Sequence, residues 1–268
     1  MYKLVRWPDS PTSEEGARRL EETIKVMEKL LDHEWLAQIT GKDRVKIIDL
    51  CSGAGIASIA LSRVLLSRGV TPEVVLVDLR RQALTEAVSH LEAMGVKAKP
   101  LCDDVLKAYR HGIKGDIVML YGLSTPHFSP WSLAALLAST TLMVNDNGVL
   151  VVEEADRFYS TCIRGKGVEG VYLELASENS VVLNMMLDYN PWTGMMKRML
   201  FDVISRRQAT LEVHLYSLSE TGALIWCFYR KVDFIPSRSR FQGLILAKEP
   251  RRIENPEEYL NYPILRGR

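Results

Sequence analysis

A short stretch that combines a carboxylate with glycines is the part of this sequence best suited to ligand chemistry. It follows a β-branched apolar run and contains Asp49, Cys51, Ser52, Gly53 and Gly55. Glycines let the backbone turn sharply and approach a ligand, and the first amides of a following helix carry partial positive charge. The spacing departs from G-x-G-x-x-G, and a carboxylate at the strand end would repel a pyrophosphate. We therefore expect a ligand that presents a cationic group to Asp49.

Further acids follow two other predicted strands. Asp78 lies roughly 20 residues after Gly55. In nucleotide-binding sheets an acid at this spacing binds the ribose, because a carboxylate can accept hydrogen bonds from both of its hydroxyls. Asp103 and Asp104 stand side by side after the next strand, and both are candidates for a contact with the ligand. Because parallel strands end at the same edge of a sheet, these acids should line one site.

The elements that must position these residues alternate between strand and helix. Parallel strands are predicted at 45–50, 73–78, 96–101, 116–121 and 149–154. Helical patterns separate them at 56–66, 81–94 and 129–144, and a capped helix starts near Ser13. Later strands are expected at 211–216, 223–229 and 241–247, the first two as a hairpin around 219–222. The order predicts an α/β fold with a doubly wound, mostly parallel seven-stranded sheet.

The motif resembles the first motif of the class I S-adenosylmethionine-dependent methyltransferases, D/E-x-G-x-G-x-G. Asp49 stands at the acidic position, Gly53 and Gly55 at the last two glycines, and Cys51 where the first glycine is usual. The resemblance covers residues 45–154. It implies a Rossmann-like fold, S-adenosyl-L-methionine as the cofactor, and a methyltransferase activity.

The resemblance also implies further contacts with the cofactor. Asp78 would bind the ribose, and either Asp103 or Asp104 the adenine amino group, with Asp104 the better match to the family pattern. The backbone of Val105 would then lie beside the adenine ring. The other implied contacts are Ser52, Leu79, Tyr121 and Gly122.

Transfer of a methyl group by in-line displacement requires alignment and a dry site rather than a covalent nucleophile. A general base is useful when the acceptor is a hydroxyl or an ammonium group, and the loop after the fourth strand is its expected place. His127 is the candidate base, although a loop histidine that bonds backbone is the alternative reading. Tyr121 is the candidate for orienting the acceptor, and Phe128 and Trp131 are expected to wall the pocket.

The resemblance and the element pattern together divide the chain. Residues 1–44 are expected to form an N-terminal helical cap and residues 45–268 the methyltransferase domain. The stretch between the fifth strand and residue 211 is too long for one crossover helix, so 155–210 is expected to be an insertion on the substrate side. Its flexible apolar side chains suit either a core or an adaptable pocket wall: Met185, Met186, Tyr189, Trp192, Met195, Met196 and Met199.

The overall charge of the chain limits the class of methyl acceptor that we expect. The chain has 268 residues, 47% of them apolar, and a formal net charge of +1. This near-neutral balance favours a small, partly apolar acceptor over nucleic acid, for which a strongly basic domain is expected. An RNA or DNA methyltransferase remains an alternative, and its only basic material is Arg206, Arg207, Arg238, Arg240, Arg251, Arg252, Arg266 and Arg268. A nucleotide-binding protein that does not methylate, such as an oxidoreductase, is the other alternative.

Four cysteines are widely spaced and form no C-x-x-C pair, so neither a disulfide framework nor a metal site is expected. No apolar run approaches the roughly 18 residues of a membrane span. We therefore expect a cytoplasmic location without a membrane partner.

Overall fold

The computed structural model describes residues 10–163, 170–177 and 180–263. Residues 1–9 of the expected cap, two short stretches of the expected insertion, and Arg266 and Arg268 lie outside the described residues.

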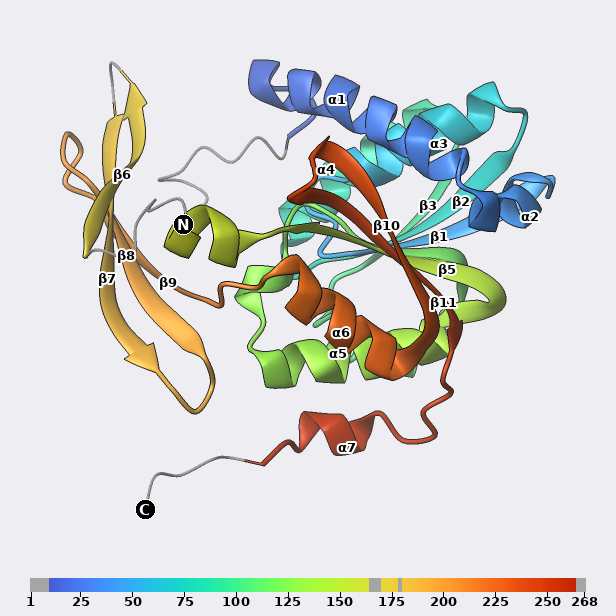
Figure 1. Cartoon of the computed structure of the whole chain (residues 1–268). Coiled ribbons are helices and arrows are strands. Elements are labelled where there is room, and N and C mark those ends of the chain that lie inside the picture. The colour runs from blue at the N-terminus through green and yellow to red at the C-terminus, as the bar shows by residue number, and fades with distance from the viewer. Residues whose placement is uncertain (1–9, 164–169, 178–179, 264–268) are drawn as a thin grey trace.

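Seven strands form the main sheet in the order β10-β11-β5-β4-β1-β2-β3 (Figure 1). Strands β1 to β5 are parallel, β11 is antiparallel to β5, and β10 is antiparallel to β11. The predicted seven-stranded, mostly parallel sheet is therefore confirmed. The strands are β1 (Arg44–Leu50), β2 (Thr71–Val77), β3 (Lys97–Leu101), β4 (Gly115–Leu120), β5 (Val144–Ala155), β10 (Tyr229–Ser239) and β11 (Gln242–Pro250).

Helices cover both faces of this sheet, because the central strands are apolar on both sides. Alternate residues of β1 face two different cores: Ile47 packs with the first helices of the chain, and Ile48 with the later ones. On one face lie α1 (Glu14–Leu31), α2 (Ala37–Thr40), α3 (Ile56–Ser67) and α4 (Arg81–Ala93). On the other lie α5 (Pro130–Met143) and α6 (Leu218–Phe228), with α7 (Glu257–Leu260) packed against α5.

Strand β1 lies inside the sheet, and the later strands are added on both sides of it. It pairs with β2 on one side and with β4 on the other, so Asp49 lies between Leu76 and Met119. Strand order reverses here, and ligands of doubly wound sheets bind outside the carboxyl ends at such a point. The ends of β1 and β4 are therefore the place where this fold forms a binding site.

The segment after β5 forms a second, antiparallel sheet in the order β6-β7-β8-β9. Its strands are β6 (Val171–Ser177), β7 (Ser180–Asn190), β8 (Met195–Asp202) and β9 (Gln208–Val213). Figure 1 shows this small sheet beside the main domain, facing the carboxyl ends of the parallel strands. Most of the described residues of the expected insertion thus belong to this sheet, which a short helical turn at Tyr159–Ile163 precedes.

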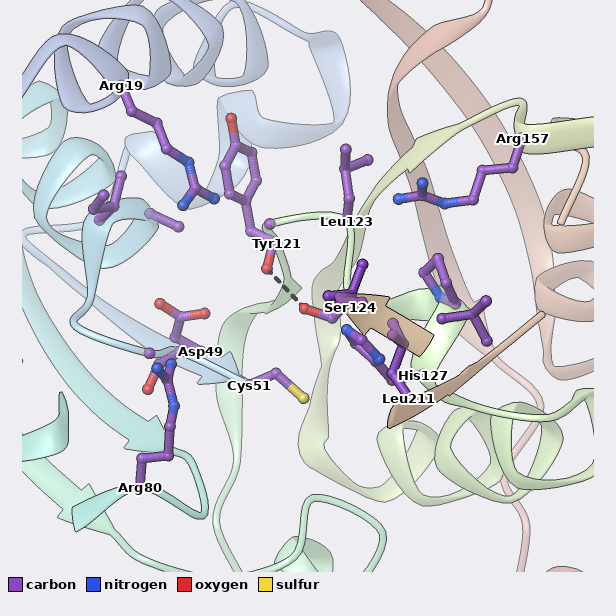
Figure 2. Close-up of a pocket in the computed structure, with 18 of the residues that line it drawn as sticks. Arg19, Asp49, Cys51, Arg80, Tyr121, Leu123, Ser124, His127, Arg157 and Leu211 are labelled. Atoms are coloured by element: carbon purple, nitrogen blue, oxygen red, sulfur yellow. Dashed lines mark hydrogen bonds between the residues drawn. The ribbon is translucent and has the colours of Figure 1, made fainter. Parts of the chain in front are cut away.

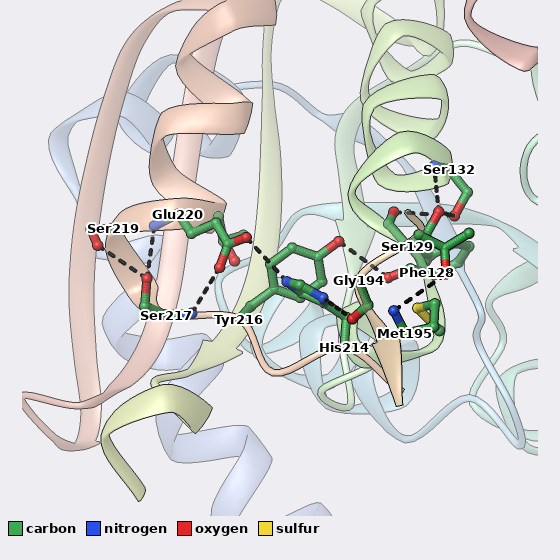
Figure 3. A network of polar contacts seen from close by, with 12 residues as sticks. Phe128, Ser129, Ser132, Gly194, Met195, His214, Tyr216, Ser217, Ser219 and Glu220 are labelled. Carbon is green, nitrogen blue, oxygen red and sulfur yellow. Dashed lines mark hydrogen bonds and ion pairs between the residues drawn. The ribbon is translucent and has the colours of Figure 1, made fainter. Parts of the chain in front are cut away.

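Polar contacts attach the small sheet to the main domain at the end of β9 (Figure 3). The backbone amide of His214 donates to the carbonyl of Pro126 at 2.8 Å, and the Tyr216 hydroxyl donates to the carbonyl of Phe128 at 3.1 Å. The His214 ring lies between the carbonyl of Gly194 and the carboxylate of Glu220. The small sheet is therefore fixed to the loop that follows β4.

The predicted hairpin around 219–222 is wrong, because Leu218–Phe228 is the helix α6. The Ser217 side chain accepts a hydrogen bond from the Glu220 amide, and the Glu220 carboxylate accepts one from the Ser217 amide. This capping box, S-x-x-E before an apolar run, is a helix-start signal that outweighs the β-propensity of the aromatic and branched residues. The strand predicted at 241–247 is confirmed as part of β11.

Candidate active site

A cavity of about 230 Å³ lies at the carboxyl ends of β1 and β4 (Figure 2). Helix α1 contributes Arg19 to its wall, and the small sheet closes the opposite side. Six of the predicted cofactor-binding residues line it: Asp49, Cys51, Ser52, Gly53, Tyr121 and Gly122. The candidate base His127 lines it as well.

The loop after β1 takes a shape that most residues resist. Cys51, Gly53 and Gly55 all have positive φ angles, of 56°, 56° and 79°. Cys51 occupies the left-handed region in which a glycine is normally placed, at a cost of about 1–2 kcal/mol. A Cβ atom on Gly55 would also lie only 2.8 Å from the Cβ of Ala87. Gly55 therefore serves close packing of α3 against α4, and does not line the cavity.

Asp49 is the central acid of the cavity, with 1% of its surface exposed. Its Oδ2 accepts a hydrogen bond from the Ser58 hydroxyl at 2.6 Å, whereas Oδ1 is buried without a partner among the described residues. Burial, with a smaller contribution from the charge of Asp78, raises the pKa of Asp49 to about 7, against the lowering effects of the hydrogen bond from Ser58 and the charge of Arg19. An unpaired carboxylate oxygen facing a cavity is suited to a cationic ligand group.

Asp78 supports the glycine loop from the end of β2. Its Oδ2 accepts from the Gly53 amide at 2.8 Å, and its Oδ1 accepts from the Arg80 amide at 2.8 Å. The Nε atom of Arg80 also donates to Oδ1, at 3.3 Å, so Oδ1 accepts two hydrogen bonds and Oδ2 one. A carboxylate oxygen has two lone pairs, so Oδ2 can accept one further hydrogen bond from a ligand. Asp78 lies next to the cavity wall rather than in it, since Gly53 and Arg80 line the cavity.

Four other predicted cofactor residues also lie outside this cavity. Leu79 is 74% exposed, and Val105 is buried in the core beneath α5. The Asp103 carboxylate binds the His111 ring at 2.7 Å, and the Asp104 carboxylate accepts from the Leu106 amide at 3.0 Å. The charge of Asp104 contributes to the raised pKa of the Cys51 thiol in the motif.

The loop after β4 shapes the other side of the cavity. The Gly122 amide donates to the Glu153 carboxylate at 2.9 Å, and Gly122 and Leu123 both have positive φ angles. This turn directs Ser124 and His127 toward the cavity (Figure 2). Partial burial lowers the pKa of His127, and the positive charge of Arg157 lowers it further. The ring is thus neutral, and able to accept a proton, at neutral pH.

Several residues of the cavity were not foreseen from the sequence. Arg19 lies on α1, and its guanidinium points to the cavity beside Tyr121 (Figure 2). Arg80 and Arg157 bring two further guanidinium groups. The small sheet contributes Glu174, Asn184, Leu200, Leu211 and Val213.

The predicted aromatic walls are placed elsewhere. Phe128 packs against the core under α5, and Trp131 stacks on Tyr262 with ring centroids 6.0 Å apart. The Trp131 indole also donates to the carbonyl of Trp192 at 3.1 Å, so it fastens the small sheet to α5. None of the methionines of the small sheet lines the cavity; Met195 instead lines a separate polar groove that shares His127.

No group of three or more histidine, cysteine or acidic side chains suited to a metal ion occurs within the described ranges. In the same part of the chain, no helix combines the length and the apolar character that a membrane crossing requires.

Comparison with known proteins places this geometry in a structural class. Neither family models nor curated protein sequences match the chain. Solved structures do match, among them an S-adenosylmethionine-dependent methyltransferase from Clostridium acetobutylicum ATCC 824, with 11% identity, a TM-score of 0.62, and 85% and 90% of the two chains covered. A protein from Pyrococcus horikoshii OT3 matches with 16% identity, a TM-score of 0.62, and 93% and 98% coverage.

A sugar N-methyltransferase from Streptoalloteichus sp ATCC 53650 also matches, with 14% identity, a TM-score of 0.55, and 85% and 87% coverage. At these identities the similarity concerns the fold. The strand order of the main sheet, the helices on both faces and the matches together show that this chain has the class I S-adenosylmethionine-dependent methyltransferase fold.

Proposed function

We propose that this chain is an S-adenosylmethionine-dependent methyltransferase acting on a small, partly apolar molecule. The observation that carries the proposal is the buried Oδ1 atom of Asp49, which lacks a partner in the described part of the chain and lies in the wall of the cavity. The buried hydroxyl of Ser52 is likewise without a partner there. Buried polar atoms are rarely left unpaired, so both indicate a polar ligand at the end of β1.

The surrounding residues fit the methionyl and ribose parts of this cofactor. Asp49 suits its ammonium group and Arg19, on the facing side of the cavity, its carboxylate. Asp78 suits the ribose hydroxyls. The sequence motif assigns the adenine to Asp104 and Val105, which lie outside this cavity, so the contact with the adenine rests on the motif alone. When bound, the cofactor supplies an electrophilic methyl group on a sulfonium, which an acceptor displaces in line.

The chain's own contribution to the reaction is alignment, exclusion of water and proton removal. Within the cavity, Tyr121 is buried at the end of β4, where it can orient an acceptor. The neutral ring of His127 has a lowered pKa and can take a proton from a hydroxyl or ammonium acceptor. We assign the roles of orienting group and general base to these two residues.

The small sheet supports an acceptor of limited size. Leu200, Leu211 and Val213 present an apolar wall to the cavity, and Asn184 and Glu174 add two polar groups. Mostly apolar walls with a few placed polar groups are typical of small-molecule sites. We therefore propose that the sheet β6 to β9 is the substrate-side insertion. The match to a sugar N-methyltransferase agrees with an acceptor of this size.

The arginines that an RNA or DNA methyltransferase would need are scattered among the described residues. Arg206 lies in the turn between β8 and β9, and Arg251 stacks over Trp226. Arg252 donates to the carbonyl of Thr141 and to Asp146. Arg251 and Arg252 follow the end of β11. That end pairs with the start of β5, whereas the cavity lies at the ends of the parallel strands, so these two arginines lie at the opposite edge of the sheet. This arrangement favours the small-molecule acceptor.

Transfer of a radiolabelled methyl group from S-adenosylmethionine tests the proposal. The protein is incubated with three acceptor pools: small amines and hydroxyl compounds, total RNA, and DNA. We expect label in the small-molecule pool and none in the nucleic acids. Label confined to RNA or DNA, together with retention on heparin that is lost steeply with salt, would overturn the choice of acceptor.

A further inference from the structure

Arg157 is a charged side chain of the cavity that the cofactor does not account for. It lies two residues after the end of β5, and its backbone amide donates to the carbonyl of Tyr216 at 2.8 Å, which fixes its position. Figure 2 shows its guanidinium directed to the cavity from the side opposite Asp49 and Arg80. It therefore faces the part of the cavity closed by the small sheet.

Within the described ranges, neither Glu154 nor Glu174 forms an ion pair with this guanidinium. Glu154 accepts from the Thr221 hydroxyl at 2.8 Å and from the Ala155 amide, and Glu174 accepts from the Asn184 amide group at 3.0 Å. The Nε atom of Arg157 is buried without a hydrogen-bond partner in the described ranges. Their charges act on Arg157 only at longer range, and its pKa is lowered chiefly by burial.

Arg157 as a whole is half-buried, but its Nε–H is buried and lacks a partner within the described ranges. A buried polar N–H is normally hydrogen-bonded, because leaving it unpaired is costly. A planar guanidinium forms its strongest hydrogen bonds with carboxylate and phosphate groups, often through two parallel contacts. The apolar wall of Leu200, Leu211 and Val213 lies in the same cavity. A ligand with an apolar body and one acidic group satisfies both features.

We propose that the methyl acceptor is an acidic small molecule whose carboxylate or phosphate group binds Arg157. This inference rests on the proposed function and specifies its substrate class. Glu174 and Asn184, in the wall of the small sheet, then face the body of the acceptor and can bind its hydroxyl or amine groups. Arg157 acts as an anchor that sets the orientation of the acceptor before His127.

The test uses the full-length protein saturated with S-adenosylhomocysteine, so that the methionyl carboxylate already occupies its own site. Benzoate, phenyl phosphate and neutral benzamide are titrated calorimetrically into wild type, Arg157→Gln, and the control Arg44→Gln, which alters an exposed arginine at the start of β1. Wild type should bind at least one anion about 10- to 100-fold more tightly than benzamide. The stronger anion identifies the acidic group as carboxylate or phosphate.

Arg157→Gln should abolish this preference with unchanged affinity for S-adenosylhomocysteine, and Arg44→Gln should retain it. A wild type without preference for either anion, or a preference that survives in Arg157→Gln, would overturn the proposal. Should Arg157→Gln fail to fold, the Arg157 Nε–H resonance of wild type decides: it should shift with the preferred anion and stay unchanged with benzamide. Failure to bind S-adenosylhomocysteine would instead count against the proposed function, and the same anion titration without it would still test Arg157.

Discussion

Asp49→Asn should change two properties independently: the pH dependence of the free energy of unfolding of the ligand-free protein, and the affinity for the cofactor. Asp49 is buried, one of its oxygens has no partner among the described residues, and its pKa is raised to about 7. In the unfolded chain the same carboxyl titrates near pH 3.9. The folded protein therefore binds more protons than the unfolded chain between these values, and ionisation of Asp49 opposes folding.

The sign and size follow from proton linkage. The contribution of this group is fully present below about pH 4, is lost as the pH rises toward 7, and is constant above about pH 8. Between about pH 5 and about pH 8 the free energy of unfolding should fall by about 3 kcal/mol because of Asp49 alone. An asparagine cannot titrate, so the variant should lack this part of the pH dependence.

Urea unfolding of wild type and Asp49→Asn across this pH range provides the measurement. Comparing slopes removes the constant cost of the substitution and the contribution of all other titrating groups. The difference between the two proteins should change by about 3 kcal/mol over the range. Parallel curves would show that Asp49 is not buried as a titrating acid, and would refute the electrostatic description of the cavity.

Three further substitutions or reactions test other parts of the site. Asp78→Ala should weaken S-adenosylhomocysteine binding by a few kcal/mol. The variant loses the proposed charge-assisted hydrogen bonds to the ribose hydroxyls and the hydrogen bond that holds the Gly53 amide. Unchanged affinity in a folded variant would contradict this prediction. His127→Ala should lower kcat and leave cofactor affinity unchanged. Because the pKa of His127 is lowered, the kcat of wild type should decline only when the pH falls below the usual histidine pKa. A decline at higher pH, or undiminished turnover of His127→Ala, would remove His127 from the mechanism. Iodoacetamide should not alkylate Cys51, because burial chiefly raises the pKa of its thiol to about 12. Mass spectrometry should detect alkylation only at the exposed Cys102, Cys162 and Cys227. Rapid alkylation of Cys51 would show that the loop after β1 opens to solvent.

The main sheet could be predicted because its signals are local. Each parallel strand is a short apolar run, and each ends at a polar residue or a turn, so β1 to β5 and the intervening helices follow from pattern alone. The motif from Asp49 to Gly55 also predicts a left-handed loop. Cys51 shows that this conformation persists without the usual glycine.

The region after β5 was harder to predict, because its structure depends on contacts between distant segments. Aromatic and branched residues favoured a strand at 223–229, whereas the capping box of Ser217 and Glu220 begins a helix. The position of the small sheet over the cavity depends on contacts with distant segments, such as those of His214 with Pro126 and of Trp131 with Trp192. Local periodicity carries no information about such docking.

The arginines of the site illustrate the same limit. Arg19 lies on a helix whose pattern separates an apolar face from a charged one, and nothing in that pattern distinguishes a solvated arginine from one that points to a cavity. Arg157 differs, because it lies two residues after the end of the fifth strand, at the edge where ligands bind. This position is the signal in the sequence that points to its place in the site.

Calorimetric titration of the purified protein with S-adenosylmethionine, S-adenosylhomocysteine and NAD tests the central claim most directly. We predict micromolar binding of both sulfur compounds, strong weakening in Asp49→Asn and Asp78→Ala, and no binding of NAD. Absence of binding by the sulfur compounds, or a preference for NAD, would show that this fold serves another ligand and would contradict the proposed function.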